Sequence, residues 1–375
     1  MPKIDYVVSE KVCTACGACE AICPVGAPRA DQLRSEIKHE EDCSDVNLFE
    51  EECAYCVDCY ACERVCPILD GFPGDDEFDN VRFVKAGRSK MHGQDGAVTS
   101  RILTSLFEQD EIDCAFGISR NEKWETEVIL MTRASDVAKT GGTKYNYMPV
   151  MASMRDIIRD VSQKYNKIAI VGCPCQSHAA RLMKENLTDK IKLILGLVCM
   201  ESFSYENLCQ DIIPNKIGLD IEDVVKMDFA KGKFVATSKT GEVKKVKIKE
   251  VAPLARDGCH HCLDYTSHSA DISLGSVGTG DGWNCVLVRT DVGEKYFNKV
   301  EGLELTDDVD LDMLKKLTDT KHKNNAWDYK EFMQRVWAIG YPNKIEQFGY
   351  EVPWKKEAVN IQKYSQIPAK EAPTP

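Results

Sequence analysis

From about residue 81 onward, strand-like and helix-like segments alternate along the chain. Short apolar runs of strand length predict strands at 81–87, 113–120, 126–132, 167–172 and 192–199. Amphipathic patterns between these runs predict helices at 97–109, about 151–163 and about 176–186. Strands and helices that alternate in this way predict an α/β domain.

The pattern changes after residue 222, where three segments read as antiparallel strands. These are 223–229, 233–239 and 242–250, and the last turn falls at Thr-Gly-Glu 240–242. Residues 310–338 have a helical pattern, and the final residues are expected to form a loose tail or to lie on a partner. The segment 69–80 is rich in Gly, Pro and Asp and marks a boundary. We therefore predict three parts: residues 1–70, residues 81–310, and a helical extension with a tail at 311–375.

The composition restricts the class of protein. The chain has 375 residues, of which 43% are hydrophobic, and a formal net charge of −12, which argues against nucleic acid as a partner. It has 18 cysteines and opens without an apolar signal segment, so the cysteines are expected to be metal ligands in a reducing cytoplasm. No apolar run approaches the roughly 20 residues of a spanning helix. We expect a cytoplasmic protein that reaches a membrane only through other subunits.

Residues 13 to 66 carry one cysteine motif twice. Both copies fit C-x2-C-x2-C-x3-C-P, the spacing of bacterial two-cluster ferredoxins, in which the fourth cysteine ligates the other cluster. This pattern predicts an α+β ferredoxin-like domain with two 4Fe–4S clusters. One cluster is assigned to Cys13, Cys16, Cys19 and Cys66, and the other to Cys56, Cys59, Cys62 and Cys23.

Two other interpretations of these cysteines are weaker. Zinc ribbons pair two C-x2-C units and do not need a third cysteine at the same step, and disulfides need an oxidising compartment. Cys53 offers a second C-x2-C-x2-C register, but only the register that starts at Cys56 ends in x3-C-P. Cys43 and Cys53 are therefore interpreted as thiols outside the clusters, in or beside an acidic insert between the two repeats that we expect to set partner choice.

A second set of cysteines lies in the larger part of the chain. Cys175 and Cys199 follow buried strands, at the edge where α/β proteins place their sites, and Cys259 and Cys262 form a close pair. These four residues suffice for a third cluster. Buried structural cysteines, or a zinc site that uses His260 or His261, are alternatives, and spacing alone does not choose between Cys173 and Cys175. Cys114, Cys209 and Cys285 lie in apolar patterns and are expected to pack.

At this point the sequence resembles the family of beta subunits of coenzyme F420-reducing hydrogenases. The resemblance covers most of residues 83–302, and the fused ferredoxin segment is similar to the F420H2-oxidising branch of that family. It rests on the segments GQDGAVTS (93–100), TGGTKY (140–145), VGCPCQ (171–176), GLVCMESFSY (196–205), MDFAKGKF (227–234), GCHHCLDYTSHSADISLGSVGTGDGW (258–283) and VLVRT (286–290).

The resemblance implies an α/β flavin domain that binds FAD and a third 4Fe–4S cluster. The family motif GxPCQ favours Cys175 over Cys173, so the third cluster would be held by Cys175, Cys199, Cys259 and Cys262. Ala97 stands where relatives often have glycine, and its methyl group is expected to change little. Three glycine-containing loops, each by itself an ordinary turn, become candidate flavin contacts. The candidate residues are Gly93, Gly96, Thr99, Gly142, Thr143, Lys144, Tyr145, Gly275, Ser276, Val277 and Gly278.

The resemblance also implies that coenzyme F420, a deazaflavin with a phosphate and a glutamate tail, is the substrate. Lys231, Lys233 and Arg289 are candidates for its basic site, although the two lysines could simply solvate a hairpin. A deazaflavin gives up a hydride and an iron–sulfur cluster takes one electron, so a flavin must stand between them. No acid–base residue is demanded.

Two functions from different classes remain open at this stage. The first is an F420H2-oxidising or F420-reducing subunit that passes electrons to a larger complex. That complex would be a membrane assembly resembling respiratory complex I or a soluble complex of the heterodisulfide reductase type. The second is an iron–sulfur adaptor without a coenzyme site, serving a hydrogenase, formate dehydrogenase or heterodisulfide reductase complex. The chain has no P-loop and no dinucleotide-binding glycine motif, which disfavours a nicotinamide reductase.

Overall fold

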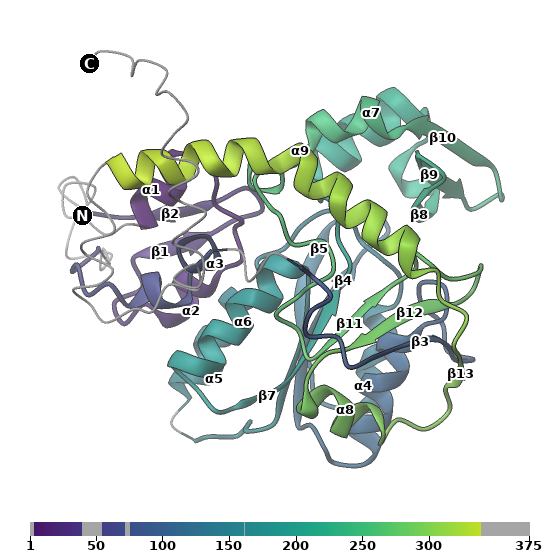
Figure 1. Cartoon of the computed structure of the whole chain (residues 1–375), viewed down its shortest axis with the longest axis horizontal. Helices are drawn as coiled ribbons and strands as arrows, with labels where there is room; N and C mark the ends of the chain where they lie inside the picture. The colour runs from purple at the N-terminus through teal and green to yellow at the C-terminus, as the bar shows by residue number, and fades with distance from the viewer. Residues whose placement is uncertain (1–3, 40–54, 72–75, 161, 339–375) are drawn as a thin grey trace.

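The computed structural model of the protein describes residues 4–39, 55–71, 76–160 and 162–338, with side chains as far as residue 325. Its centre is a mixed sheet in the order β13-β3-β12-β11-β7-β6-β4-β5 (Figure 1). In chain order the strands are β3 (Phe83–Arg88), β4 (Cys114–Arg120), β5 (Thr126–Met131), β6 (Ile168–Gly172), β7 (Ile191–Leu197), β11 (Ile272–Gly275), β12 (Asn284–Val288) and β13 (Glu304–Thr306). The strands β4, β6, β7 and β11 are mutually parallel. β5 pairs antiparallel with β4 at one edge, and β12, β3 and β13 continue the sheet beyond β11 with each neighbouring pair antiparallel. The predicted α/β architecture is confirmed.

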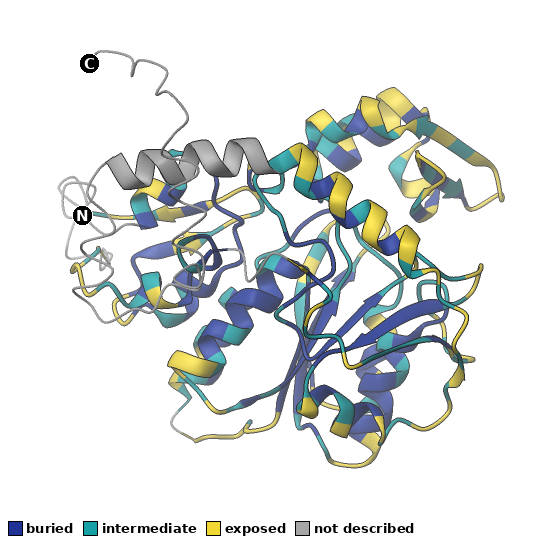
Figure 2. Cartoon of the chain, in the orientation of Figure 1, coloured by how far each residue is buried: buried dark blue, intermediate teal, exposed yellow. Residues whose placement is uncertain are grey.

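Helices cover both faces of this sheet, and the residues between them are buried (Figure 2). On one face lie α4 (Val98–Glu108) and α8 (Asp291–Phe297), and on the other lie α5 (Met154–Arg159) and α6 (Pro174–Asn186). The apolar runs of β6 and β7 are buried because both faces are covered, which is typical of parallel strands. The helix predicted at 151–163 is shorter: the 3₁₀ helix η4 (Val150–Ser153) precedes α5, which ends at Arg159.

A separate three-stranded sheet packs beside a π-helix. It has the order β10-β9-β8 and consists of β8 (Val224–Ala230), β9 (Lys233–Ser238) and β10 (Val243–Lys247). These strands confirm the predicted change of pattern, except that 248–251 forms the short helix α7 (Ile248–Val251). The π-helix η5 (Glu206–Ile217) shares a hydrophobic cluster with them. The remaining short helices here are η3 (Ala134–Thr140), η6 (Ile221–Asp223), η7 (Ala252–Leu254) and η8 (Asp257–Cys259).

The N-terminal segment with the repeated cysteine motif packs directly on the larger part of the chain. It contains α1 (Ile4–Ser9), α2 (Ala18–Ile22), β1 (Pro28–Ala30), β2 (Ser35–Ile37), η2 (Ala61–Val65) and α3 (Pro67–Asp70). Ala18, Ala21 and Val65 belong to the same hydrophobic core as Met154 of α5 and Met183 of α6. Figure 1 shows this segment beside α5 and α6. The two parts therefore share one core, which the linker-like composition of 69–80 does not reveal.

The C-terminal helix α9 (Leu311–Ala338) confirms the helix predicted at 310–338. It crosses the molecule toward the N-terminal segment (Figure 1). Among the described residues, no helix combines the length and the apolar character needed to cross a membrane. The tail beyond 338, together with Cys43 and Cys53, lies outside the described residues.

Candidate functional site

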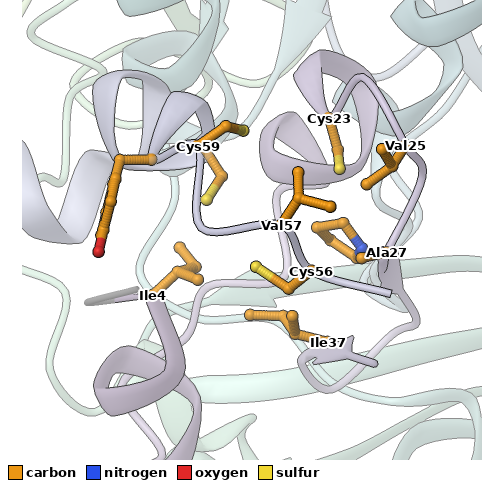
Figure 3. Close-up of a pocket in the computed structure, with 11 residues that line it drawn as sticks. Ile4, Cys23, Val25, Ala27, Ile37, Cys56, Val57 and Cys59 are labelled. Carbon is orange, nitrogen blue, oxygen red and sulfur yellow. The ribbon is translucent and has the colours of Figure 1, made fainter. Parts of the chain in front are cut away.

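The first group of thiols lies at the outer side of the N-terminal segment. Cys23 of the first motif lines one cavity with Cys56, Cys59 and Cys62 of the second. Figure 3 shows the side chains of Cys23, Cys56 and Cys59 around this space. The sulfur of Cys23 accepts a hydrogen bond from the backbone N–H of Gly26 at 3.2 Å. The structure thus brings together the four cysteines that the motif assigns to one cluster, and their role as ligands stays a prediction.

The second group consists of Cys13, Cys16, Cys19 and Cys66, all of them buried. Burial raises the pKa of the Cys66 thiol well above its usual range, and the nearby thiols of Cys16 and Cys13 raise it further. The sulfur of Cys13 accepts hydrogen bonds from the backbone N–H groups of Ala15 and Ser35, at 3.3 and 3.4 Å. Hydrogen bonds to sulfur of this kind tune iron–sulfur clusters, so this environment suits the second cluster.

The third group is a cavity lined by Cys175, Cys199, Cys259, Cys262 and also Cys173. Cys175 lies in the first turn of α6, after β6, and Cys199 follows β7. Because β6 and β7 are parallel neighbours, their carboxyl ends bring these two thiols to one edge of the sheet. Cys259, at the end of η8, and Cys262, in the loop that follows, reach the same cavity. The sequence left Cys173 and Cys175 open on spacing alone, the family resemblance favoured Cys175, and both thiols line the cavity.

Polar groups surround the sulfurs of this cavity. The hydroxyl of Tyr147 lies 3.3 Å from the sulfur of Cys175, and the hydroxyl of Ser202 lies 3.6 Å from that of Cys259. Burial raises the pKa of the Cys175 thiol to about 12 and that of Cys262 to about 11, and neighbouring thiols add to both shifts. The thiols would therefore be protonated at neutral pH unless a bound metal centre stabilises the thiolates.

Five thiols line this cavity: Cys173, Cys175, Cys199, Cys259 and Cys262. Four cysteine thiolates are the ligand set that holds a 4Fe–4S cluster. The donor set therefore fits a 4Fe–4S cluster.

The helix α9 contributes two side chains that no sequence pattern singled out. Lys321 donates to the backbone carbonyls of Cys199 and Asp264, both at 2.8 Å. Asn325 donates to the carbonyls of Cys259 and Cys262, at 2.9 and 2.7 Å. Polar residues in an amphipathic helix usually face solvent, so only the packing of α9 reveals that these two face the cysteines.

Arg256 joins this cavity to the N-terminal segment. Its guanidinium group donates to the carbonyl of Thr14 at 2.6 Å and to that of Gln32, and it stacks 3.6 Å from the ring centre of Tyr147. The backbone also closes tightly here, because a Cβ atom on Gly258 would lie 2.3 Å from the carbonyl oxygen of Cys13. The second and third thiol groups are thus neighbours. Burial raises the pKa of the Cys16 thiol, and the nearby thiols of Cys175 and Cys13 raise it further.

The three predicted flavin loops lie beside one another on the amino-terminal side of α4. A Cβ atom on Gly96 would lie 2.4 Å from the carbonyl oxygen of Gly87, so only glycine fits there. Asn284 accepts from the N–H of Val98 at 3.1 Å and donates to Ser276 at 3.3 Å, which joins the first and third loops. The middle loop lies beside the first, because a Cβ atom on Gly141 would be 3.4 Å from His92.

The other predicted flavin residues lie in these same loops. Gly93, Thr99, Gly142, Thr143, Val277 and Gly278 are partly buried. Lys144 donates to the carbonyls of Thr140 and Gly141, at 2.7 and 3.0 Å. Burial, aided by the nearby Arg120, lowers the pKa of Lys144 to about 8. The ring of Tyr145 packs edge-on against Phe229, with ring centres 5.0 Å apart.

The three candidate contacts for the coenzyme do not meet. Lys231 and Lys233 are exposed at the turn between β8 and β9, where the φ angles of Lys231 and Gly232 are 50° and 74°. Arg289 lies at the amino end of β11, away from Gly275, and is only 3% exposed. It donates to Ser273, Asn80 and Thr266 side chains and to backbone carbonyls. Arg289 is therefore a structural residue, because its donors already have protein partners.

Comparison with known families identifies the larger part of the chain. Two family models describe the beta subunit of coenzyme F420 hydrogenase/dehydrogenase; residues 84–155 match the model for its N-terminal part, and residues 165–309 match the model for its C terminus. The chain belongs to this family. Residues 6–29 match a 4Fe-4S binding domain, which confirms the ferredoxin-like character of the N-terminal segment.

Individual relatives agree with this family. The chain is 49% identical to a subunit of the F420H2 dehydrogenase of Methanosarcina mazei, over 88% of this chain and 95% of that protein. It is 39% identical to the beta subunit of the coenzyme F420 hydrogenase of Methanococcus voltae, over 56% of this chain and 77% of that protein. A chain in the structure of the F420-reducing hydrogenase complex from Methanosarcina barkeri superposes with a TM-score of 0.64 and 30% identity, covering 68% of this chain and 93% of that chain.

Proposed function

We propose that this family member oxidises F420H2, or reduces F420, and passes single electrons to a larger complex. The observation that carries this proposal is the succession of three thiol groups, in which the cavity at the carboxyl edge of the sheet adjoins the ferredoxin-like segment through Gly258 and Cys13. The names of the relatives in M. mazei and M. voltae supply the substrate.

The chain would hold three 4Fe–4S clusters. Residues 1–70 would hold two, on Cys13, Cys16, Cys19 and Cys66 and on Cys23, Cys56, Cys59 and Cys62. The domain at 81–310 would hold the third, on Cys175, Cys199, Cys259 and Cys262. The extension at 311–375 supports this third site through Lys321 and Asn325.

The loops around Gly96, Gly142 and Ser276 would hold FAD near the carboxyl edge of the sheet. When bound, the flavin supplies the exchange between a hydride and single electrons. The amino end of α4 and the glycines beside it suit its phosphates, since backbone N–H groups bind anions there. Lys144 would lie near the ring, and Lys231 and Lys233 would attract the anionic tail of F420.

The partner would be a membrane complex resembling respiratory complex I, or a soluble complex of the heterodisulfide reductase type. Electrons would leave through the outer thiol group of Cys23, Cys56, Cys59 and Cys62, because Cys59 is the exposed cysteine among them. The chain would bind neither nucleic acid nor lipid directly.

Iron and flavin analysis followed by anaerobic stopped-flow mixing with F420H2 tests the proposal. We expect about twelve irons per chain, from four irons per cluster, and one FAD. Flavin absorbance should bleach first, and cluster absorbance should fall afterwards. About eight irons, no flavin and no response to F420H2 would instead identify an iron–sulfur adaptor.

A further inference from the structure

Lys321 is a buried lysine at the wall of the third thiol cavity. Its side chain is 2% exposed and lines the cavity together with Cys199, Cys259 and Cys262. Burying an ammonium group is costly unless nearby groups compensate it. The two acceptors of its ammonium group at 2.8 Å are backbone carbonyls, which satisfy hydrogen bonds but do not neutralise the charge. A full positive charge therefore faces the cavity.

Nearby carboxylates offset part of this charge, because Asp264 and Glu201 both attract the ammonium group of Lys321. Asp264 directs its carboxylate to the backbone N–H of His268, at 3.1 and 3.2 Å. Glu77 accepts hydrogen bonds from the backbone of Tyr265 and Thr266 and lies 3.0 Å from His322. The carboxylates of Asp264 and Glu77 are directed to other donors and do not touch Lys321, and Lys321 and Arg256 are the cations that line the cavity with the cysteines.

Asn325 lies one helical turn beyond Lys321 on the same face of α9. Its amide bridges the carbonyls of Cys259 and Cys262. Together the two side chains hold the backbone of three of the four predicted ligands of this cavity. Both residues lie beyond residue 309, where the match to the family model ends.

We propose that α9 tunes the third cluster, with Lys321 as a fixed positive charge that makes the cluster easier to reduce and Asn325 as a brace for its ligands. This inference rests on the proposed cluster in that cavity. Reduction adds one negative charge to a centre that already carries four thiolates, and a buried cation nearby stabilises the reduced form. Both are positioning residues, since neither would ligate iron.

A redox titration of the cluster-loaded protein monitored by electron paramagnetic resonance (EPR) tests the charge. The signal of the third cluster is the one that Cys175→Ser alters. Lys321→Gln removes the charge but still offers an N–H donor. In this variant we expect the equilibrium constant for reduction of the third cluster to fall at least about tenfold, which lowers its midpoint potential by 59 mV for one electron. Lys321→Arg keeps the charge, so its equilibrium constant for reduction should stay within about twofold of that of the parent protein. The matched control is Lys323→Gln, an exposed lysine on the same helix, which should leave the midpoint unchanged.

Asn325→Ala separates the brace from the charge. In this variant the equilibrium constant for reduction of the third cluster should stay within about twofold of the parent value. An iron chelator should remove the third cluster several-fold faster than from the parent protein. An unchanged midpoint in Lys321→Gln with the third signal present would overturn the inference about charge, and unchanged cluster loss in Asn325→Ala would overturn the brace. If the unaltered protein has about eight irons and no third signal, the proposed function itself fails.

A measurement on the unaltered protein covers the case in which Lys321→Gln does not retain its cluster. Protein labelled with 15N-lysine should show a nitrogen coupling to the reduced third cluster in pulsed EPR. The absence of that coupling would refute the placement of the charge, whatever the variant does.

Discussion

Replacing Arg256 with methionine should loosen the junction between the ferredoxin-like segment and the rest of the chain. Arg256 is 2% exposed, and its guanidinium group holds the carbonyls of Thr14 and Gln32 in the N-terminal segment. Methionine keeps most of the apolar packing but donates no hydrogen bond. The buried carbonyl of Thr14 and the partly buried carbonyl of Gln32 would be left without this donor.

The size of the effect follows from these contacts. Each hydrogen bond to a charged group contributes about 1.5–3 kcal/mol, and stacking on Tyr147 adds about 1 kcal/mol. Because the contacts share one side chain, their effects are not additive, and we expect a loss of about 4 kcal/mol. That is a large part of the roughly 5–15 kcal/mol that stabilises a typical domain.

Hydrogen–deuterium exchange of the cluster-loaded protein is the suitable assay. Peptides from residues 10–35 should exchange faster by two to three orders of magnitude in Arg256→Met, since each 1.4 kcal/mol is a factor of ten, while peptides from β6 and β7 should change little. Arg82→Met is the matched control, because Arg82 is 42% exposed and makes surface ion pairs with Asp291 and Glu294. Equal exchange in residues 10–35 for both variants would refute the role of Arg256 as a clamp.

Three further predictions concern single residues. Ala97→Gly should change the free energy of unfolding, measured by urea titration, by less than about 1 kcal/mol. Glycine relieves the left-handed φ of 50°, but this gain is offset by the greater backbone entropy of the unfolded chain and by the loss of the methyl group. A larger loss of stability would contradict this prediction. Since the folded pKa of Lys144 lies near 8, below its usual 10.5, protonation disfavours the folded state below pH 8, and this cost disappears between pH 8 and 10.5. The parent should thus gain stability relative to Lys144→Gln over that range, and a difference independent of pH would contradict it. Cys175→Ser should lose the EPR signal of the third cluster while flavin reduction by F420H2 stays fast. Cys173→Ser should keep the signal and the fast flavin reduction. If Cys173→Ser instead loses the signal and Cys175→Ser keeps it, Cys173 is the ligand.

Periodicity located most elements of the large domain because burial on both faces leaves a strong signal. The apolar run at 167–172 became β6 almost to the residue, and the helix at 97–109 became α4. The antiparallel strand β13 and the π-helix η5 were not predicted, since three residues carry little pattern and a π-helix departs from the usual helical period.

The candidate site was predictable only as far as its chemistry is local in sequence. Cysteine spacing anticipated that Cys23 would join the second motif, and the ends of β6 and β7 anticipated the meeting of Cys175 and Cys199. Arg256 was not predicted, because its contact with Thr14 spans 242 residues. Arg289 was expected at the coenzyme and is instead held in the interior by protein acceptors.

The hydrophobic core that the N-terminal segment shares with α5 and α6 has a consequence for protein engineering. Gly17 approaches Ala152 so closely that a Cβ atom would lie 2.6 Å from its backbone nitrogen, and the N–H of Met151 donates to the carbonyl of Cys16 at 3.0 Å. A ferredoxin from another source, grafted in place of residues 1–70, would not match this surface. A working chimera would have to carry the facing residues of η4, α5 and α6 with it, so the segment cannot be exchanged by itself.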